Sequence, residues 1–405
     1  MNFKITLRCD VMRMDNTKHR FFASCPRGLE RVLEEEFHSI GISVTRRTDG
    51  GVGFDAPWSS MCWVNLQTRM ASRVLLEVGQ SQYQTEEDVY RAANAVSWPD
   101  WFTASHTIKV KVSARRCSLP SLDFLTLRIK DAVCDKFLAI HRKRPSVDTH
   151  KPQVRLDAFL DENTVTFYLD TSGEPLFKRG YRMAAVEAPL RENLAAGLLR
   201  LTGWTPGEVL FDPMCGSGTI ALEAALIGRC IAPGLSRHFA FERLLSHDAA
   251  LWGRLRETAR AGQLPVAPAA IYASDRDRAA IEIAQRRLQR AGVAADVHLQ
   301  ESDLFALKAP VEKGILLINP PYGIRLDRRE NLETFYPKLG DWLKQNFAGW
   351  RAYVFTGDAR LPKLIGLTPS RRIPLYNGPL ECRLYEFKII EGSMRRRSSI
   401  NNSNF

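Results

Sequence analysis

The chain has 405 residues, a formal net charge of +12 at neutral pH and a pI near 9.4. Its length exceeds that of one ordinary hydrophobic core and predicts two or three domains. Hydrophobic residues make up 45% and charged residues 25%, as in soluble globular proteins, and no apolar run is long enough to cross a bilayer. The composition argues against a membrane-inserted protein, and the positive charge favours a polyanionic partner, with nucleic acid the first expectation.

Targeting signals and cysteines indicate where the protein works. Charged residues interrupt the first twenty positions, so they lack the continuous apolar segment of a secretory signal, and we expect a cytoplasmic protein. Residues 1–19 and 391–405 have no apolar periodicity and are expected to be disordered. The eight cysteines are scattered, without zinc-ligand spacing, which predicts reduced thiols and no metal.

The N-terminal part carries the pattern of a small α+β unit. Apolar spacing predicts a helix over residues 29–37, and Gly41 is expected to cap its end. A second helix is predicted at residues 59–68. Strands are predicted at residues 21–24, 42–45, 51–55 and 73–79. The order of these elements indicates an antiparallel sheet.

Residues 106–155 are strongly basic, with twelve Lys and Arg against four Asp. A strand at 107–114, a helix at 122–140 and a strand pair at 154–159 and 164–170 are predicted there. A solvated face whose basic residues complement the helix dipole would explain a lone triplet. The clustering favours RNA backbone contact instead. The residues expected to bind RNA are Lys109, Lys111, Arg115, Arg116, Arg142, Lys143 and Arg144.

After residue 188 strands alternate with helices, which predicts a parallel sheet. An apolar strand, 209–212, ends in Asp212 and is followed by a glycine-containing turn and a helix at 220–228. Gly216 and Gly218 let the backbone approach a ligand closely, and the helix N-terminus offers amides to a ligand carboxylate. No Lys-Ser/Thr pair follows, which argues against a Walker-type phosphate loop.

Two further strands end in carboxylates. Asp275 follows the strand at 271–274, and Asp303 follows the strand at 297–300. In a doubly wound sheet these strand ends meet, so Asp275 can accept from ribose hydroxyls and Asp303 from an adenine amine. Each Asp alone could equally cap a helix. The residues expected to bind the cofactor are Asp212, Pro213, Cys215, Gly216, Ser217, Gly218, Thr219, Asp275, Asp303 and Asn319.

The most specific motif is Asn319-Pro320-Pro321-Tyr322, which follows a buried strand at 314–318. The prolines remove two donors and leave the Asn319 side-chain oxygen and the Pro320 carbonyl as acceptors for an aromatic amine. Tyr322 could stack on an extruded base. These four residues are the predicted catalytic set. A Pro-rich turn without function is the alternative.

The remaining elements complete the same sheet. We predict a helix at 332–346, a strand at 351–356, a short helix after Asp358 and a last strand at 382–389.

With these motifs in place, the chain resembles the THUMP-containing class I methyltransferases, nearest to those that modify guanine N2 in bacterial 23S ribosomal RNA. The resemblance rests on residues 212–219, residues 319–323, Arg179-Gly180-Tyr181-Arg182 and residues 188–193. It implies an α/β fold, with a Rossmann-like class I methyltransferase domain preceded by an α+β ferredoxin-like and THUMP RNA-binding module. It implies a ferredoxin-like segment at 20–80, a THUMP domain at 81–185 and a methyltransferase domain at 186–390.

The resemblance also implies that S-adenosylmethionine is the cofactor, held by Asp212, the glycine turn, Asp275 and Asp303, and that 23S rRNA or a large-subunit assembly intermediate is the partner. Some relatives continue into a second methyltransferase domain, so any second activity is expected to be absent or to lie in another polypeptide. Three alternatives stay open: guanine-N2 methylation of tRNA, N6-adenine methylation of DNA or RNA, and a non-catalytic RNA-binding assembly factor.

Overall fold

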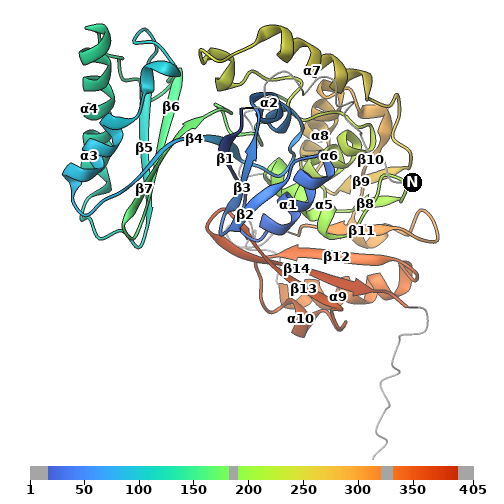
Figure 1. Ribbon diagram of the computed structural model, residues 1–405. Helices are drawn as coiled ribbons and strands as arrows, with labels where there is room; N and C mark the ends of the chain where they lie inside the picture. Colours follow the sequence, from blue (N-terminus) through green and yellow to red (C-terminus); the bar gives the residue numbers. More distant parts are fainter. Residues whose placement is uncertain (1–16, 182–189, 321–331, 391–405) are drawn as a thin grey trace, which may run out of the picture. The chain divides into compact units, whose positions relative to one another are not determined.

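The computed structural model describes residues 17–181, 190–320 and 332–390, and the chain divides into two compact units. Unit 1 comprises residues 1–182, 191–197 and 230–264, and unit 2 comprises residues 183–190, 198–229 and 265–405. In the described parts of the chain, each unit is built on one seven-stranded sheet (Figure 1). The mixed sheets confirm the expected combination of an α+β part and an α/β part.

The unit 1 sheet has the strand order β2-β3-β1-β4-β7-β6-β5. Its strands are β1 (His19–Ser24), β2 (Val44–Thr48), β3 (Gly51–Ala56), β4 (Arg73–Gln82), β5 (Ile108–Arg115), β6 (Val154–Asp161) and β7 (Thr164–Asp170). Strand β4 pairs with β1 through its first residues and with β7 along most of its length, so it joins the N-terminal strands to the basic segment in one sheet. Strand β5 is the outer strand on that side and pairs in parallel with β6.

The helices of unit 1 are α1 (Glu30–Ser39), α2 (Trp58–Gln67), α3 (Glu86–Ala95), α4 (Leu122–His141) and α7 (Ala249–Ala261). Gly41 takes a positive φ of 84° just after α1, as expected of a C-terminal cap. Helices α3 and α7 are not among the elements predicted from the sequence, although their buried residues follow helical spacing. Helix α3 begins with a capping box, in which the Thr85 hydroxyl accepts from the Asp88 amide and the Asp88 carboxylate accepts from the Thr85 amide.

The unit 2 sheet has the strand order β10-β9-β8-β11-β12-β14-β13. Its strands are β8 (Leu210–Asp212), β9 (Ile271–Asp275), β10 (Val297–Glu301), β11 (Ile315–Ile318), β12 (Arg351–Thr356), β13 (Arg371–Asn377) and β14 (Leu380–Lys388). The strands from β10 to β12 are parallel, and β14 and β13 are antiparallel. The order reverses between β8 and β11, the point at which doubly wound sheets bind ligands.

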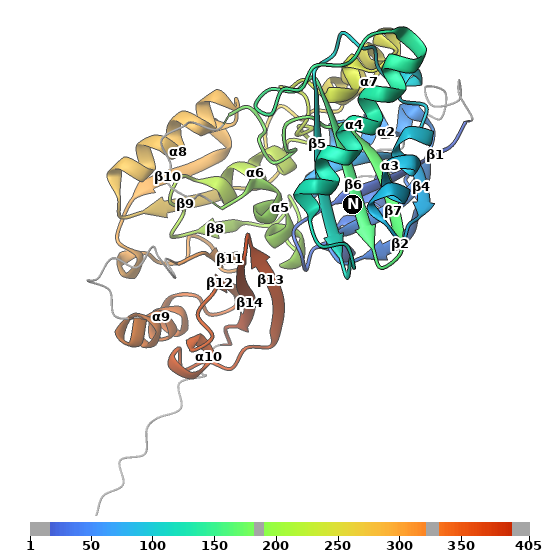
Figure 2. The same ribbon diagram turned by 90° about the vertical axis from the view of Figure 1, so that its left-hand side faces the viewer.

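The helices of unit 2 are α6 (Thr219–Gly228), α8 (Arg278–Arg290), α9 (Leu332–Asn346) and α10 (Leu361–Leu364). Helix α5 (Glu192–Leu201) begins in unit 1 and ends in unit 2. Helices α6 and α8 lie against β8, β9 and β10 (Figure 2). Helix α9 packs over β11 and β12, where its Leu339, Trp342 and Leu343 join a buried apolar cluster with Leu316 and Val354. None of the helices in the described ranges is both long and apolar enough to cross a membrane.

The predicted strand, turn and helix succession of unit 2 is confirmed, with α9 and β12 at the predicted residues. The sequence pattern does not predict strand β13, because only Leu375 of its residues is buried and Pro374 interrupts the strand pattern. Strand β13 lies at the edge of the sheet, where Pro374 is tolerated because an edge strand does not need a backbone N–H donor at every position.

Gly340 offers a test of the packing of α9. An alanine Cβ at this position would come 1.8 Å from the carbonyl oxygen of Ile365. Gly340→Ala is therefore expected to lower the free energy of unfolding by about 3 kcal/mol, although alanine ordinarily stabilises a helix. Urea denaturation measures the effect. Gly253→Ala in α7 is the control, because its Cβ would meet no atom within 4 Å, and it is expected to be neutral or stabilising. Equal midpoints for the two variants would contradict the close approach of α9 to Ile365.

Candidate active site

The turn after β8 is held in a conformation that depends on glycine. Gly216 and Gly218 have φ values of 51° and 73°, which other residues rarely adopt. The Cys215 amide donates to the Ser274 carbonyl of β9 at 2.9 Å, and the Gly218 amide donates to the Cys215 carbonyl at 2.8 Å. Helix α6 begins at Thr219 without a side-chain cap. The turn therefore directs the N-terminal end of α6 toward the edge where β8 ends.

Asp275, at the end of β9, is bound to this turn. Its Oδ2 accepts from the Gly216 amide at 2.8 Å, and its Oδ1 accepts from the Asp277 amide at 3.0 Å. Asp277 is the residue that caps α8, so helix capping does not explain Asp275. Asp303 differs from Asp275, because it does cap a helix: its Oδ1 accepts from the Phe305 amide at the start of the 3-10 helix η5 (Leu304–Ala306).

Asp212 is 1% exposed, and neither of its carboxylate oxygens has a partner within ordinary hydrogen-bond geometry in the described structure. Burial first, and the charge of Asp275 second, raise the pKa of the Asp212 carboxyl well above its ordinary value, and the nearby Met214 amide offsets part of this effect. The same burial, with Asp212 and Asp275, raises the pKa of the Cys215 thiol. Cys215 is therefore a neutral thiol with no features of a nucleophile.

Asn319 directly follows β11, the parallel neighbour of β8. Leu316 pairs with Phe211, so Asn319 lies two residues beyond the level of Asp212 at the same edge of the sheet. The Asn319 Oδ1 is buried without a hydrogen-bond partner in the described structure, and Pro320 is buried. Pro321 and Tyr322 lie outside the described residues. The glycine turn and the start of the Asn-Pro motif thus share one edge of one sheet.

Two contacts to the turn come from residues that the sequence does not single out. One is the Ser274 carbonyl, and the other is the guanidinium of Arg287, which donates to Ser217 and Thr219. Arg287 lies three residues after Ala284 and directly before Leu288, on the buried face of α8, whereas the neighbouring Arg286 is exposed. Helical spacing could have placed Arg287 on this face, but only the tertiary contact shows that it binds the turn.

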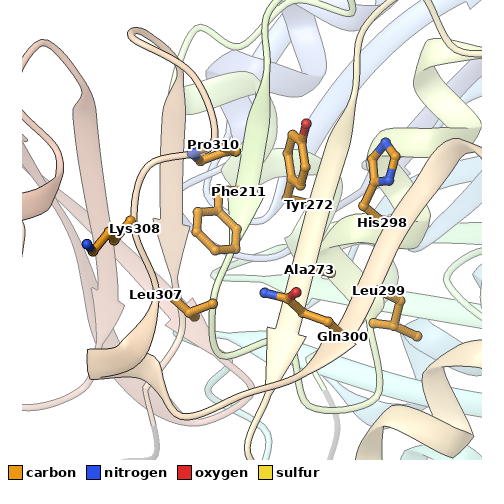
Figure 3. Close-up of a pocket in the computed structure, with 9 residues that line it drawn as sticks. All are labelled: Phe211, Tyr272, Ala273, His298, Leu299, Gln300, Leu307, Lys308 and Pro310. Carbon is orange, nitrogen blue, oxygen red and sulfur yellow. The ribbon is translucent and has the colours of Figure 1, made fainter.

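A separate cavity of about 400 Å³ lies on the sheet face that carries Phe211, Tyr272 and His298 (Figure 3). The Tyr272 and His298 rings are stacked with centroids 4.9 Å apart, and Phe211 meets Tyr272 edge to face. The predicted cofactor residues are not part of its lining. Strand alternation places Phe211 and Asp212 on opposite faces, so this cavity and the strand-end site are distinct.

The seven basic residues expected to contact RNA fall into groups along β5. Arg115 and Arg116 lie at its C-terminal end, while Arg142, Lys143 and Arg144 follow α4, whose end lies near the start of β5. The two ends of this eight-residue strand are about 23 Å apart. Lys109 donates to the Thr149 carbonyl at 2.9 Å, and Lys111 is exposed.

Ion pairs within the protein reduce part of this charge. Arg115 pairs with Asp49 at 3.6 Å, and Arg116 pairs with Glu162 at 3.0 Å. A third pair joins Arg144 and Asp135 at 2.7 Å. Arg142 and Lys143 are exposed and, like the exposed Lys111, have no ion pair in the described structure, so their charges are available to a polyanion.

The described ranges contain neither a candidate metal-binding cluster nor a disulfide. No group of three or more His, Cys, Asp or Glu side chains is placed there to hold a metal ion. The seven cysteines of the described residues are free thiols.

Three consecutive parts of the chain match models of known protein families. Residues 179–386 match a model described as the RMKL-like methyltransferase domain, residues 83–170 match the THUMP domain and residues 20–75 match the RlmL ferredoxin-like domain. The chain belongs to the RMKL-like methyltransferase family. The order of its parts is confirmed: a ferredoxin-like domain and a THUMP domain precede a class I methyltransferase domain that uses S-adenosylmethionine.

Individual proteins that are similar to this chain are also named as methyltransferases. Ribosomal RNA large subunit methyltransferase K/L of Syntrophotalea carbinolica is 40% identical over 92% of the chain, which spans 54% of that relative. A Synechocystis protein, slr0064, provisionally named an RNA methyltransferase, is 35% identical over 94% of the chain and 99% of its own length. The crystal structure of SMU.472, a provisionally assigned methyltransferase complexed with SAH, superposes with a TM-score of 0.84, 29% identity and coverage of 93% and 99%. The chain spans about half the length of the K/L relatives it matches.

Asp212 predicts an unusual dependence of stability on pH. Its pKa is higher in the folded protein than in the unfolded chain, so the folded state binds the proton more tightly and wild-type stability falls as the pH rises from about 4 through the folded pKa. Asp212→Asn cannot ionise and is expected to be more stable than wild type at pH 8 by roughly 1–3 kcal/mol, with little difference at pH 4. Urea denaturation of the cofactor-free protein at both pH values measures this. A difference of the same size at both would contradict the assigned burial.

Proposed function

We propose that this enzyme transfers a methyl group from S-adenosylmethionine to the exocyclic N2 amine of a guanine in large-subunit (23S) ribosomal RNA. One observation carries the proposal: neighbouring parallel strands bring the glycine turn and the unpartnered Asn319 Oδ1 to one edge. An acceptor buried without a partner is costly, which is explained if an amine of the substrate completes it.

The cofactor fits the atoms at this edge. A Cβ at Gly216 would meet no atom within 4 Å, so the space beside the turn is open to a ligand. We assign the cofactor's donors to the unpartnered Asp212 carboxylate and to Asp275, and its carboxylate to the amides where α6 begins. Pro213, Cys215, Ser217 and Thr219 shape the turn, and Asp303 is assigned to the adenine amine. When bound, S-adenosylmethionine supplies an electrophilic methyl group.

Positioning of the amine is the main task of the protein. The lone pair of an aromatic amine is conjugated into the ring, so the amine is a weak nucleophile. The Asn319 Oδ1 and the Pro320 carbonyl are assigned to its two hydrogens, so that the lone pair is directed at the methyl group. Pro321 and Tyr322 complete the proposed set, with Tyr322 stacking on the extruded base. Near-attack positioning of this kind is worth on the order of 7–11 kcal/mol in favourable cases.

The choice of substrate rests on other grounds. A THUMP domain with exposed basic residues favours RNA, and several relatives at 35–40% identity are named as methyltransferases of large-subunit ribosomal RNA. Guanine N2 follows from the motif resemblance, because two acceptors alone do not separate guanine from adenine. We also propose the domain limits 80/81 and 185/186, and that the enzyme acts in the cytoplasm, where ribosomal RNA is found.

Asn319→Ala tests the proposed chemistry. The variant loses one of two acceptors and is expected to slow methyl transfer at least about a hundredfold, because a misplaced reacting group costs that much. The assay measures transfer of labelled methyl groups to rRNA from a strain that lacks the gene. Asn346→Ala removes an amide at the end of α9 and is the control, expected to leave the rate unchanged. Full activity of Asn319→Ala would refute the assigned role.

The same preparation separates the candidate substrates. rRNA from the deletion strain, tRNA from that strain and duplex DNA are offered in parallel, and the modified nucleoside is identified by mass spectrometry. N2-methylguanine in rRNA alone is the expected product. N6-methyladenine, or transfer to tRNA, would replace the proposed target, and failure of all three acceptors with intact cofactor binding would favour an assembly factor.

Arg142 and Lys143 test the RNA contact. Replacing both by Gln is expected to weaken binding to rRNA fragments of different sequence alike and to reduce the slope of log K against log salt by about 1.5, since each lost phosphate contact removes roughly 0.7–0.9. Filter binding at several salt concentrations gives the slope. Arg31→Gln, which removes an exposed arginine of α1, is the control. An unchanged slope in the double variant would exclude these residues from the interface.

A further inference from the structure

Helix α8 packs against the glycine turn through two residues of one face. A Cβ on Gly218 would come 2.9 Å from the Ala284 Cβ, so the turn and helix are in close contact there. Three residues further along α8, the Arg287 Nη1 donates to the Ser217 carbonyl at 2.8 Å, the Ser217 hydroxyl at 2.9 Å and the Thr219 hydroxyl at 3.0 Å. Residues three apart share a helix face, so one face of α8 fixes the whole end of the turn.

The environment of Arg287 is unusual for a cation, because the residue is 1% exposed. A buried charge is costly unless hydrogen bonds compensate it, and the three acceptors of its Nη1 belong to the glycine turn and the first residue of α6. A guanidinium presents its donors in fixed directions, which the single ammonium of lysine cannot reproduce.

We propose that Arg287 is a positioning residue, which holds the glycine turn in the conformation that receives the carboxylate of the methionine portion of S-adenosylmethionine. Anions bind at helix N-termini because the amides and the helix dipole point toward them. Arg287 fixes the turn on either side of Gly218. The effect on turnover rests on the proposed function, whereas the effect on cofactor binding does not.

A pair of ligands separates this role from general packing. 5′-Methylthioadenosine keeps the adenosine and sulfur of the cofactor but lacks the amino-acid portion. In Arg287→Met, calorimetry is expected to show at least about tenfold weaker binding of S-adenosylmethionine and a change within about twofold for methylthioadenosine. Arg287→Lys keeps the charge without the planar donors and is expected to lie between Arg287→Met and wild type. Arg286→Met is the matched control and should bind both ligands as wild type does.

Steady-state kinetics give a second readout. The KM for S-adenosylmethionine is expected to rise in both Arg287 variants, with kcat at saturating cofactor within about threefold of wild type, because a correctly bound cofactor is still positioned for transfer. Circular dichroism and the melting temperature establish that each variant is folded. If Arg287→Met does not fold, Arg287→Lys is compared with wild type on the same two ligands.

Two results would overturn the proposal: unchanged affinity for S-adenosylmethionine, or equal loss of affinity for both ligands. The second would mean that Arg287 supports the fold of unit 2 as a whole. The binding assay contains no RNA, so an incorrect target base would leave its outcome unchanged. Conversely, a normal ratio of the two dissociation constants in Arg287→Met would remove the positioning role without affecting the assignment of guanine N2.

Discussion

The parallel pairing of β8 with β11 is the constraint on which the site depends. These strands are neighbours in the sheet but lie about a hundred residues apart in the chain. Strands β9 and β10 come between them in the sequence and lie on the other side of β8 in the sheet. Because the strand order reverses at this point, the connections leave toward opposite sides and open a crevice at the strand ends. The turn after β8 and the motif after β11 both emerge there, so a cofactor and a base can meet without any change in the sheet.

The edge so formed contains groups that a protein without a ligand would avoid. Asp212 and Asn319 bury acceptor atoms that lack partners in the described structure, and burial raises the pKa of the Asp212 carboxyl and so favours its neutral form. Such groups lower stability, and in the proposed function the cofactor and the substrate amine supply the missing donors. Contacts from two other elements fix the glycine turn beside these groups. Asp275 at the end of β9 accepts from the Gly216 amide, and Arg287 of α8 donates to Ser217.

Unit 1 contains the basic residues that we propose to contact RNA. Strand β4 continues one sheet from the ferredoxin-like strands into the THUMP strands, and β5 forms the outer strand on that side. Several basic residues near β5 are engaged in ion pairs, whereas Arg142 and Lys143 extend from the end of α4. Net charge therefore overstates the surface available to RNA, and the position of each cation relative to its carboxylate neighbours decides its contribution.

The sequence by itself determined the order of strands and helices, the glycine turn, the Asn319 motif and the family, because each depends on local spacing. It did not predict β13, an edge strand with one buried residue and a proline. It also did not predict helix α3, although the Thr85–Asp88 capping pair of this helix is a local signal. Nor could it show that Asp275 binds the turn while Asp303 caps a helix, since both follow strands. Helical spacing could place Arg287 on the buried face of α8, but only the tertiary structure decided its contacts, because hydrogen bonding there depends on which distant segment packs against that face.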